Sequence, residues 1–351
     1  MTVVGEAAGG AVAGGDVPGE AAERAAADEP ADPMAGPAAD HALLDAMTVG
    51  ALTWIDGMRP AFRLPAAAAT EADPDHALKP LGELAELTHL VRDHHPLPAA
   101  RGLADGLFRF AWEQTGQGEL FAELVRNEPQ ATYPVELYGV FARAGLHHSG
   151  TEELLAVTTS LRHWRVARED HTRTLGVLNA EHRIGLTPHA DFDAVLALTG
   201  LGRCAEPWAL DRHGVYGITH DVFHVTDWGR APHRMPTPLA EYLRLWTPAW
   251  TETWLEEKLW DLVGELLAVR ACLPGAAHDA AAWQRLAGAQ RADGAVPETG
   301  SVPPDDIAPE DLFLGCYHST LVTAFAATLA RTAAMPPASP AAPFRESETA
   351  L

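Results

Sequence analysis

The chain has 351 residues, of which 47% are hydrophobic, enough for a sizeable core in one large domain or two ordinary ones. Its formal net charge is −23, from 48 acidic and 25 basic residues. This balance argues against nucleic acid and anionic membrane surfaces as partners, because both are bound through basic patches.

Residues 1–40 are rich in Ala, Gly, Pro, Asp and Glu and hold almost no large apolar groups. Such a segment cannot offset the entropy of ordering, so we expect a disordered acidic tail here and a second disordered tail at residues 336–351. The N-terminus has neither the basic start nor the compact apolar region of a signal peptide. The chain also has no run of about 18 uncharged apolar residues. These features predict a cytoplasmic protein whose folded domain spans residues 41–335.

Between the tails, apolar residues recur at spacings of three and four, which is typical of amphipathic helices. Glycine, proline and asparagine separate these segments. The expected helices, in chain order, are 41–55, 81–92, 99–113, 135–144, 151–164, 171–182, 190–198, 215–228, 239–270, 279–289 and 309–333. Within the segment 239–270, Pro248 marks an expected break or kink. No strand–helix alternation or hairpin pattern occurs, so the chain is expected to be all-α.

About a dozen helices with short connections fit two architectures. One is an open solenoid of stacked helix pairs, and the other is an (α/α)6 toroid closed around a central cavity. The sequence has no fixed-period repeat. The toroid is favoured because the candidate polar residues lie on helices and face inward by periodicity.

The strongest candidate site is the segment 213–229, HGVYGITHDVFHVTDWG. The side chains that share one face of a helix here are Tyr216, His220, Phe223, His224 and Asp227. Two imidazoles one turn apart, followed by a carboxylate, can converge on a metal ion, a shared proton or a polar substrate. Three interpretations stay open: His220, His224 and Asp227 bind a metal such as zinc, form a metal-free acid–base pocket, or are structural groups bonded to neighbouring hydroxyls.

Other candidates carry weaker signals. An aromatic series at a spacing of four is more typical of core packing than of a cavity that stabilises a cation, and consists of Tyr242, Trp246, Trp250 and Trp254. His318 lies at a predicted helix start and is either a buried structural histidine or a partner of the first site. Cys316 is more typical of an inert core thiol than of a nucleophile.

Residues 283–294 read WQRLAGAQRADG. This segment resembles the glutamine–tryptophan repeat of squalene-hopene cyclases and related α-toroids, although Val296 stands near the place of the final tryptophan. The resemblance implies that Gln290 caps a helix end and that Gly294 makes the following turn.

Residues 316–321 read CYHSTL and are similar to the Tyr-His-Thr segment of protein prenyltransferase β subunits, toroids in which this histidine binds zinc. The resemblance implies a zinc-ligand role for His318. The Asp-x-Cys pair that completes the prenyltransferase site has no counterpart upstream. The Asp-x-Asp-Asp acid of class II cyclases also lacks a complete match, because Asp191-Phe-Asp193 has no final aspartate.

Residues 216–229 (Tyr-x-x-Thr-His-x-x-Phe-His-x-Thr-Asp-x-Gly) and 317–320 (Tyr-His-Ser-Thr) together resemble an actinobacterial (α/α)6-toroid family of unknown function, found near natural-product gene clusters, over residues 40–335. The fold analogy favours a bacterial secondary-metabolite or antibiotic biosynthetic enzyme, a cyclase or otherwise an isomerase or lyase. It would use acid–base or Lewis-acid catalysis on a small apolar metabolite.

The expected catalytic residues are Tyr216, His220, His224, Asp227 and His318. The expected ligands, if a divalent metal such as zinc binds, are His220, His224, Asp227 and His318. The alternative is a non-catalytic helical binding or regulatory protein. The enzyme hypothesis requires His220, His224 and His318 to meet around one pocket.

Overall fold

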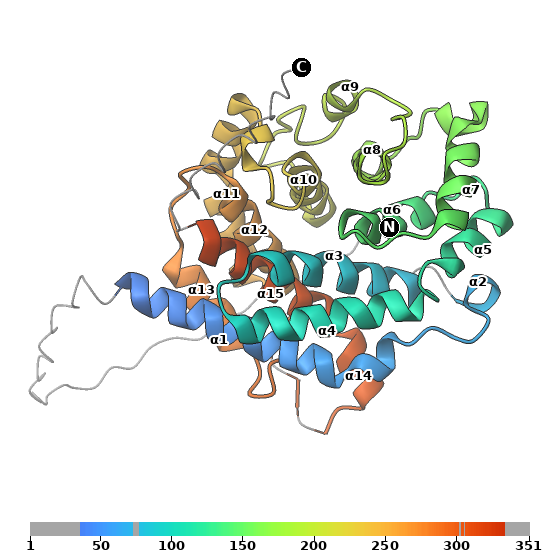
Figure 1. The fold of residues 1–351 in the computed structure, drawn as a ribbon. Helices are drawn as coiled ribbons and strands as arrows, with labels where there is room; N and C mark the ends of the chain where they lie inside the picture. Colours follow the sequence, from blue (N-terminus) through green and yellow to red (C-terminus); the bar gives the residue numbers. More distant parts are fainter. Residues whose placement is uncertain (1–35, 73–76, 302, 305, 334–351) are drawn as a thin grey trace, which may run out of the picture.

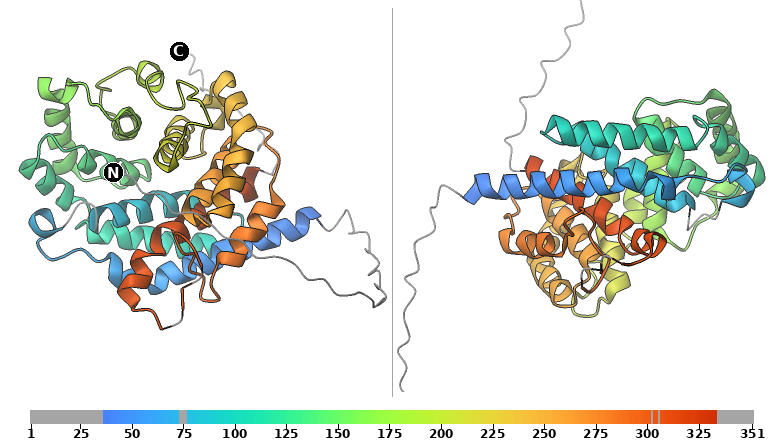
Figure 2. Two further views of the ribbon diagram at one scale, coloured as in Figure 1. Left: turned by 180° about the vertical axis from the view of Figure 1, so that it is seen from behind. Right: turned by 90° about the horizontal axis from the view of Figure 1, so that it is seen from below.

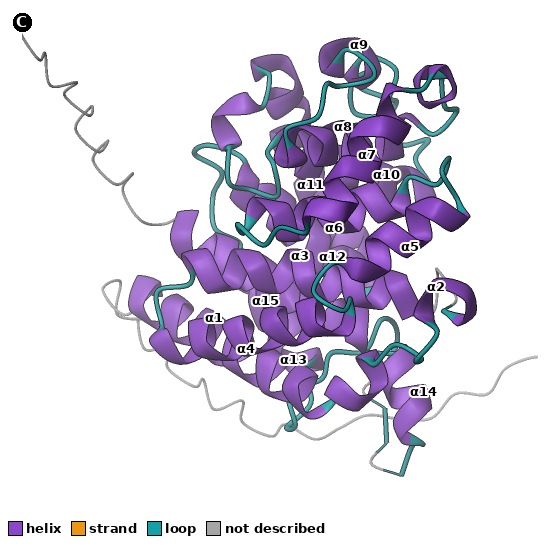
Figure 3. Ribbon diagram, turned by 45° about the vertical axis from the view of Figure 1, so that its right-hand side comes forward, coloured by secondary structure: helices purple, strands orange, loops and turns teal. Residues whose placement is uncertain are grey.

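The structure is a computed structural model that describes residues 36–72, 77–301, 303–304 and 306–333. Within these residues the regular structure is helical (Figure 3), apart from one isolated bridge between Leu259 and Thr299. The all-α prediction is therefore confirmed. Most of the two predicted tails lies outside the described residues, but residues 36–40 form the start of the first helix instead of part of a tail.

Six helices pack against one another in a closed circuit, in which each contacts the next and the last returns to the first. In order these inner helices are α3 (Lys79–His94), α6 (Tyr133–Arg143), α8 (His171–Ile184), α10 (Arg212–Val225), α12 (Trp260–Cys272) and α15 (Tyr317–Ala333). In Figure 1, α8 and α10 are seen nearly end-on while α3 lies lengthwise, so the inner helices are not parallel.

The remaining helices pack outside this circuit and separate its members along the chain. They are α1 (Gly36–Gly57), α2 (Ala68–Glu71), α4 (Pro98–Gln114), α5 (Glu119–Asn127), α7 (Ser149–Ser160), α9 (Phe192–Leu196), α11 (Thr237–Glu256), α13 (Ala280–Ala289) and α14 (Pro309–Leu314). The long helix α1 packs against α4 and α15 along one side of the molecule (Figure 2). Short 3-10 turns complete the order at Arg59–Phe62, Arg162–Arg165 and Pro232–Arg234.

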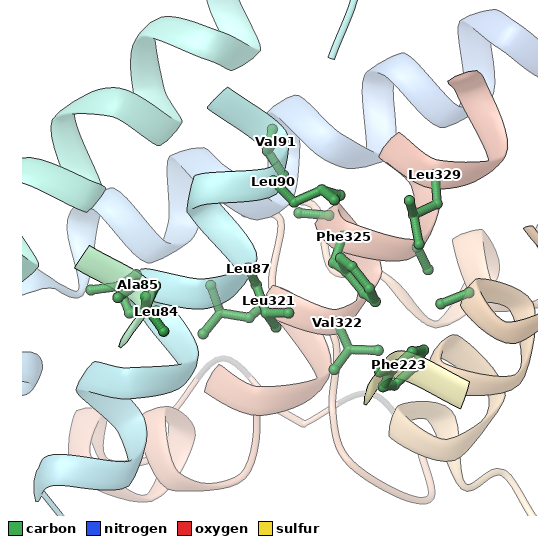
Figure 4. Close-up of a cluster of buried hydrophobic side chains, with 14 of the residues drawn as sticks. Leu84, Ala85, Leu87, Leu90, Val91, Phe223, Leu321, Val322, Phe325 and Leu329 are labelled. Carbon is green, nitrogen blue, oxygen red and sulfur yellow. The ribbon is translucent and has the colours of Figure 1, made fainter. Parts of the chain in front are cut away.

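The core is densest around α15, which contacts α1, α3 and α12. Figure 4 shows Leu321, Val322 and Phe325 of this helix between the leucines of α3 and Phe223 of α10. The segment Pro309–Ala333 is long and apolar enough to cross a membrane, but 83% of its apolar window is buried inside the protein. Burial against the protein itself accounts for the apolar composition of this segment.

Two expected long helices are each divided in the structure. The segment 239–270 is not broken at Pro248, which lies inside α11, but at the turn before α12, where Lys258 has a left-handed φ of 54°. The segment 309–333 divides into α14 and α15. The helix α5 was not expected, because it is short and follows three residues with positive φ, Gly116, Gln117 and Gly118.

Residues 283–294, which resemble the glutamine–tryptophan repeat, connect the end of α13 to α1 by noncovalent contacts. Gln290 caps the end of α13, and its side-chain amide donates hydrogen bonds to the carbonyl oxygens of Met47 (3.1 Å) and Gly294 (2.9 Å). Gly294 has a φ of 102° and lies so close to Gly50 that a Cβ atom there would stand 2.0 Å from its carbonyl oxygen. The roles implied for Gln290 and Gly294, a helix cap and a turn, are the roles these residues have.

Candidate active site

The six inner helices enclose a cavity of about 800 Å3, and each of them contributes side chains to its wall. Tyr216, His220, His224 and His318 all line this cavity. Part of the wall is apolar, and Figure 4 shows Phe223, Val322 and Phe325 of this part close together. The cavity size is in the range of small-molecule sites, which are mostly apolar with a few convergent polar groups.

In the cavity wall, His318 lies between Glu265, which is buried, and Glu83, which is partly exposed. Its Nδ1 is 3.1 Å from Glu83 Oε2, and its Nε2 is 3.5 Å from Glu265 Oε1. Burial alone would lower the pKa of His318, but the two carboxylates outweigh it and raise that pKa well above the usual value. His318 is therefore an imidazolium at neutral pH, and both of its N–H groups are directed at carboxylates.

Glu265 also approaches His220, one turn before His224 on α10. The Glu265 Oε2 atom accepts a hydrogen bond from the Thr219 hydroxyl and lies 3.8 Å from His220 Nδ1. Burial raises the pKa of Glu265, but His220 and His318 outweigh burial and lower it. Glu265 is thus an ionised carboxylate beside two imidazoles.

The tautomer of neutral His220 follows from its main-chain contact. Its Nδ1 lies 2.8 Å from the carbonyl oxygen of Tyr216, which can only accept a hydrogen bond. Nδ1 therefore carries the proton, and Nε2 has the free lone pair. The side chain of His220 is 40% exposed and lines the cavity, so this lone pair is open to a ligand.

Tyr216 is directed at a carboxyl group behind the cavity wall. Its hydroxyl donates a hydrogen bond to Asp261 on α12. Burial raises the pKa of Asp261 to about 6, against the opposing effect of the Tyr216 hydrogen bond. Burial, and then the negative charge of Asp261, also raise the pKa of Tyr216, so this phenol stays protonated.

His224 lies deeper than His220 and is a neutral imidazole. Burial, followed by the nearby His220 and Arg183 side chains, lowers its pKa to about 3. Its Nδ1 atom is buried without a hydrogen-bond partner among the described residues. Gly176 makes room for the ring, because a Cβ atom at this position would stand 3.0 Å from His224 Cε1.

Asp227 does not continue the predicted helical face. The helix α10 ends at Val225, and Asp227, Trp228 and Gly229 follow it with positive φ angles of 52°, 58° and 79°. This left-handed turn rotates Asp227 away from the two histidines. Both oxygens of its carboxylate accept hydrogen bonds from Arg143, at 2.7 Å for the Nη1 contact. The expected convergence of Asp227 with His220 and His224 is therefore wrong.

The arrangement does not assemble the proposed metal ligands. Asp227 is bonded to arginine, and the ring nitrogens of His318 are directed at Glu83 and Glu265. Among the described residues, no group of three or more His, Cys, Asp or Glu side chains has the arrangement to hold a metal ion. His220 and His224 are the members of the zinc set that remain without a carboxylate in hydrogen-bond contact.

The sequence patterns did not predict the acidic residues of the site. Glu83, Glu86, Asp261 and Glu265 are each at most partly exposed and sit inside helices with many apolar residues. The one available signal was the spacing of four between Asp261 and Glu265 within the run WDLVGELLAV, which is apolar on every other face. Carboxylates on a helix that is otherwise fully apolar indicate a buried polar site.

Apart from His318, the weaker candidates lie outside the cavity wall. None of Tyr242, Trp246, Trp250 and Trp254 lines the cavity. They pack on the core or contact main-chain oxygens, as Tyr242 does at Ala205. Burial raises the pKa of Cys316 to about 11, so this thiol is not poised as a nucleophile.

The fold and site define an all-helical protein with a charged, cavity-centred site enclosed by a circuit of helices. The chain belongs to the family DUF6895, a domain of unknown function, whose family model matches residues 48–328. This match covers five of the six inner helices in full and α15 as far as residue 328. No curated protein and no solved structure matches the chain.

Proposed function

We propose that this protein is an enzyme that acts by acid–base catalysis on a small molecule held in the cavity. The observation that carries the proposal is His220, whose Nε2 lone pair is open to the cavity while its Nδ1 is bonded to Tyr216 and faces Glu265. A general base needs this combination of an accessible lone pair, a fixed orientation and a nearby negative charge.

The proposed architecture is the (α/α)6 toroid. The closed circuit of the six inner helices supports it, as do the outer helices that separate them along the chain. In such a fold, side chains from all inner helices can reach one central cavity, which agrees with the composition of the cavity wall.

The chemistry divides among three groups. His220 Nε2 removes a proton from the bound molecule, and the Glu265 carboxylate stabilises the imidazolium that results. The imidazolium of His318 lies between Glu83 and Glu265 and keeps both carboxylates ionised in a buried place. We therefore assign to His318 a positioning role, since its own N–H groups are occupied.

Proton removal of this kind serves a cyclisation, an isomerisation or an elimination, and these are the reaction types we propose. The ligand geometry gives less support to a Lewis-acid mechanism, because the zinc set is not brought together. The setting we propose is secondary-metabolite biosynthesis in a bacterial cytoplasm, with a small molecule and not nucleic acid or membrane as the partner.

The proposal is tested by turnover and isotope exchange. The full chain is incubated in D2O with a library of small carbonyl compounds and alkenes, and products and deuterium uptake are measured by mass spectrometry. We expect at least one compound to react, and we expect the His220→Gln variant to lose at least about 100-fold in rate.

The matched control is His213→Gln, because His213 is an exposed histidine on the same helix and should not affect the rate. Equal rates for wild type and His220→Gln would contradict the proposed base. Compounds that bind in the cavity without any reaction would favour the alternative, a non-catalytic binding protein.

A further inference from the structure

Three arginines surround two carboxylates beside the cavity, and Arg183 and Glu86 of this group line its wall. The Arg183 Nη2 atom lies 3.2 Å from Glu86 Oε1 and 3.1 Å from Asp227 Oδ1. Arg143 binds Asp227 through both of its terminal nitrogens, and Arg230 approaches Glu86 at 3.3 Å. Three positive charges against two negative ones leave this cluster, defined here as the arginine cluster, with one positive charge in excess.

Neighbouring acids do not remove this excess. One further acid, Asp93, opposes the lowering of the pKa of Arg143 and Arg230, but it is paired with Arg92 at 3.0 Å. Its other contact is His89, whose pKa is lowered to about 3 by burial and Arg230, so that this ring is neutral. Each group therefore leaves the count of the arginine cluster unchanged.

The arginine cluster is also short of acceptors. Arg183 Nε and Arg230 Nη2 are buried and have no hydrogen-bond partner in the part of the chain that the structure describes. A buried N–H group without a partner is costly, and more so when it belongs to a charged group. Burial together with the repulsion of Arg183 and Arg230 lowers the pKa of Arg143 to about 9, in line with an uncompensated positive charge.

This excess lies beside the proposed active site. Arg183 is 7% exposed and lines the same cavity as His220 and His224. Arg173 and Lys79 also line the wall but differ from Arg183, because both are largely exposed to solvent and both have acidic partners. Arg173 is paired with Glu136 at 3.1 Å, and Lys79 approaches Glu83 at 3.9 Å. Arg183 is thus the buried arginine of the cavity wall, and it belongs to a cluster with one positive charge in excess.

We infer that the substrate is a monocarboxylate with an apolar body, whose carboxylate lies against Arg183 and whose body contacts the wall around Phe223, Val322 and Phe325. One carboxylate supplies one negative charge, which neutralises the excess, and it offers an acceptor to Arg183 Nε, the nitrogen of this guanidinium that has no partner among the described residues. A phosphate would bring nearly two charges and leave a net negative site. This inference rests on the proposed function, since it names the substrate class of the same cavity.

The test compares acids with their neutral amides. Octanoate, phenylacetate and 4-phenylbutyrate, each paired with its primary amide, are titrated into the full chain at low salt and pH 7.5 in a calorimeter. We expect at least one acid to bind about tenfold or more tighter than its amide. Equal affinities would overturn the inference and leave the cavity as a binding site, whereas no binding by any compound would count against the proposed function as well.

Two variants assign the preference to its source. Arg183→Met should abolish the preference for the acid, and Arg173→Met should preserve it, because Arg173 lines the same cavity but already has a partner. Arg230→Met leaves the cavity wall unchanged but removes the excess charge, so it should also weaken the preference for the acid. This second variant keeps the inference testable if Arg183→Met fails to fold. A preference that survives in a folded Arg183→Met or Arg230→Met protein would overturn the inference.

Discussion

At the scale of residues, the site depends on carboxylates that fix the state of their neighbours. Glu265 contacts His318 on one oxygen and Thr219 and His220 on the other. The pKa of His318 is raised because both of its nitrogens face glutamates, whereas His220 keeps a free lone pair because only one nitrogen is engaged. The difference between a positioning histidine and a basic histidine therefore comes from their partners and not from the residue type.

Tyr216 and Asp261 offer a test of how much a single buried donor contributes. In Tyr216→Phe, the Asp261 carboxylate loses one hydrogen bond and keeps the one from the Leu262 main-chain N–H, so we expect the free energy of unfolding at pH 7.5 to fall by about 1–2 kcal/mol. The folded pKa of Asp261 is raised to about 6, so this carboxyl holds a proton at pH 5 that the unfolded chain releases. A protonated Asp261 carboxyl is stabilised less by the Tyr216 hydroxyl, so the loss in free energy of unfolding should be smaller at pH 5.

Urea denaturation of both proteins at the two pH values measures this difference. The control is Tyr133→Phe, because the Tyr133 hydroxyl makes only an exposed contact of 3.4 Å with Glu128. We expect this control to change the free energy of unfolding by no more than about 0.5 kcal/mol. A Tyr216→Phe effect that does not depend on pH would show that the hydrogen bond to Asp261 is unimportant for stability.

At the scale of elements, the circuit of helices depends on close approaches at small residues. Gly139 of α6 lies against Ala180 of α8, where a Cβ atom would stand 3.0 Å from the Ala180 Cα atom. Gly264 of α12 similarly faces Val322 of α15, where a Cβ atom at Gly264 would stand 2.8 Å from the Val322 Cγ1 atom. Neighbouring inner helices can therefore approach closely, and this closeness shapes the cavity that they enclose.

The pair α6 and α8 can be tested with two glycine-to-alanine variants. Gly139→Ala should lower the free energy of unfolding by about 1–3 kcal/mol, because the new methyl group meets the main chain of α8. Gly102→Ala is the control, since Gly102 lies on the exposed side of α4 with nothing within 4 Å. There the higher helix propensity of alanine should raise stability by up to about 1 kcal/mol. Changes of the same sign, measured by chemical denaturation, would contradict this packing.

At the scale of the whole molecule, the helical class and the shared cavity of His220, His224 and His318 could be predicted, because periodicity reports which face of a helix is buried. The partners of these histidines could not. Glu83 and Glu265 are far apart in the sequence and meet only through the packing of α3, α12 and α15.

The error at Asp227 has a similar origin. A spacing of three or four residues predicts a common face only while the helix continues, and α10 ends two residues before Asp227. The acceptor role of Asp227 towards Arg143 depends on a contact between residues 84 positions apart, which no local pattern reports. Local periodicity thus identified where the cavity lies but not the arginine cluster at its end.

The central claim is that His220 presents a basic Nε2 to the cavity while His318 is held as a cation. Nitrogen-15 NMR of the histidine-labelled chain tests it most directly, with the two signals assigned by their loss in His220→Gln and His318→Gln. We predict that the neutral form of His220 is protonated at Nδ1 and bare at Nε2, and that both nitrogens of His318 are still protonated at pH 8. A His220 protonated at Nε2, or a His318 that is neutral at this pH, would contradict it.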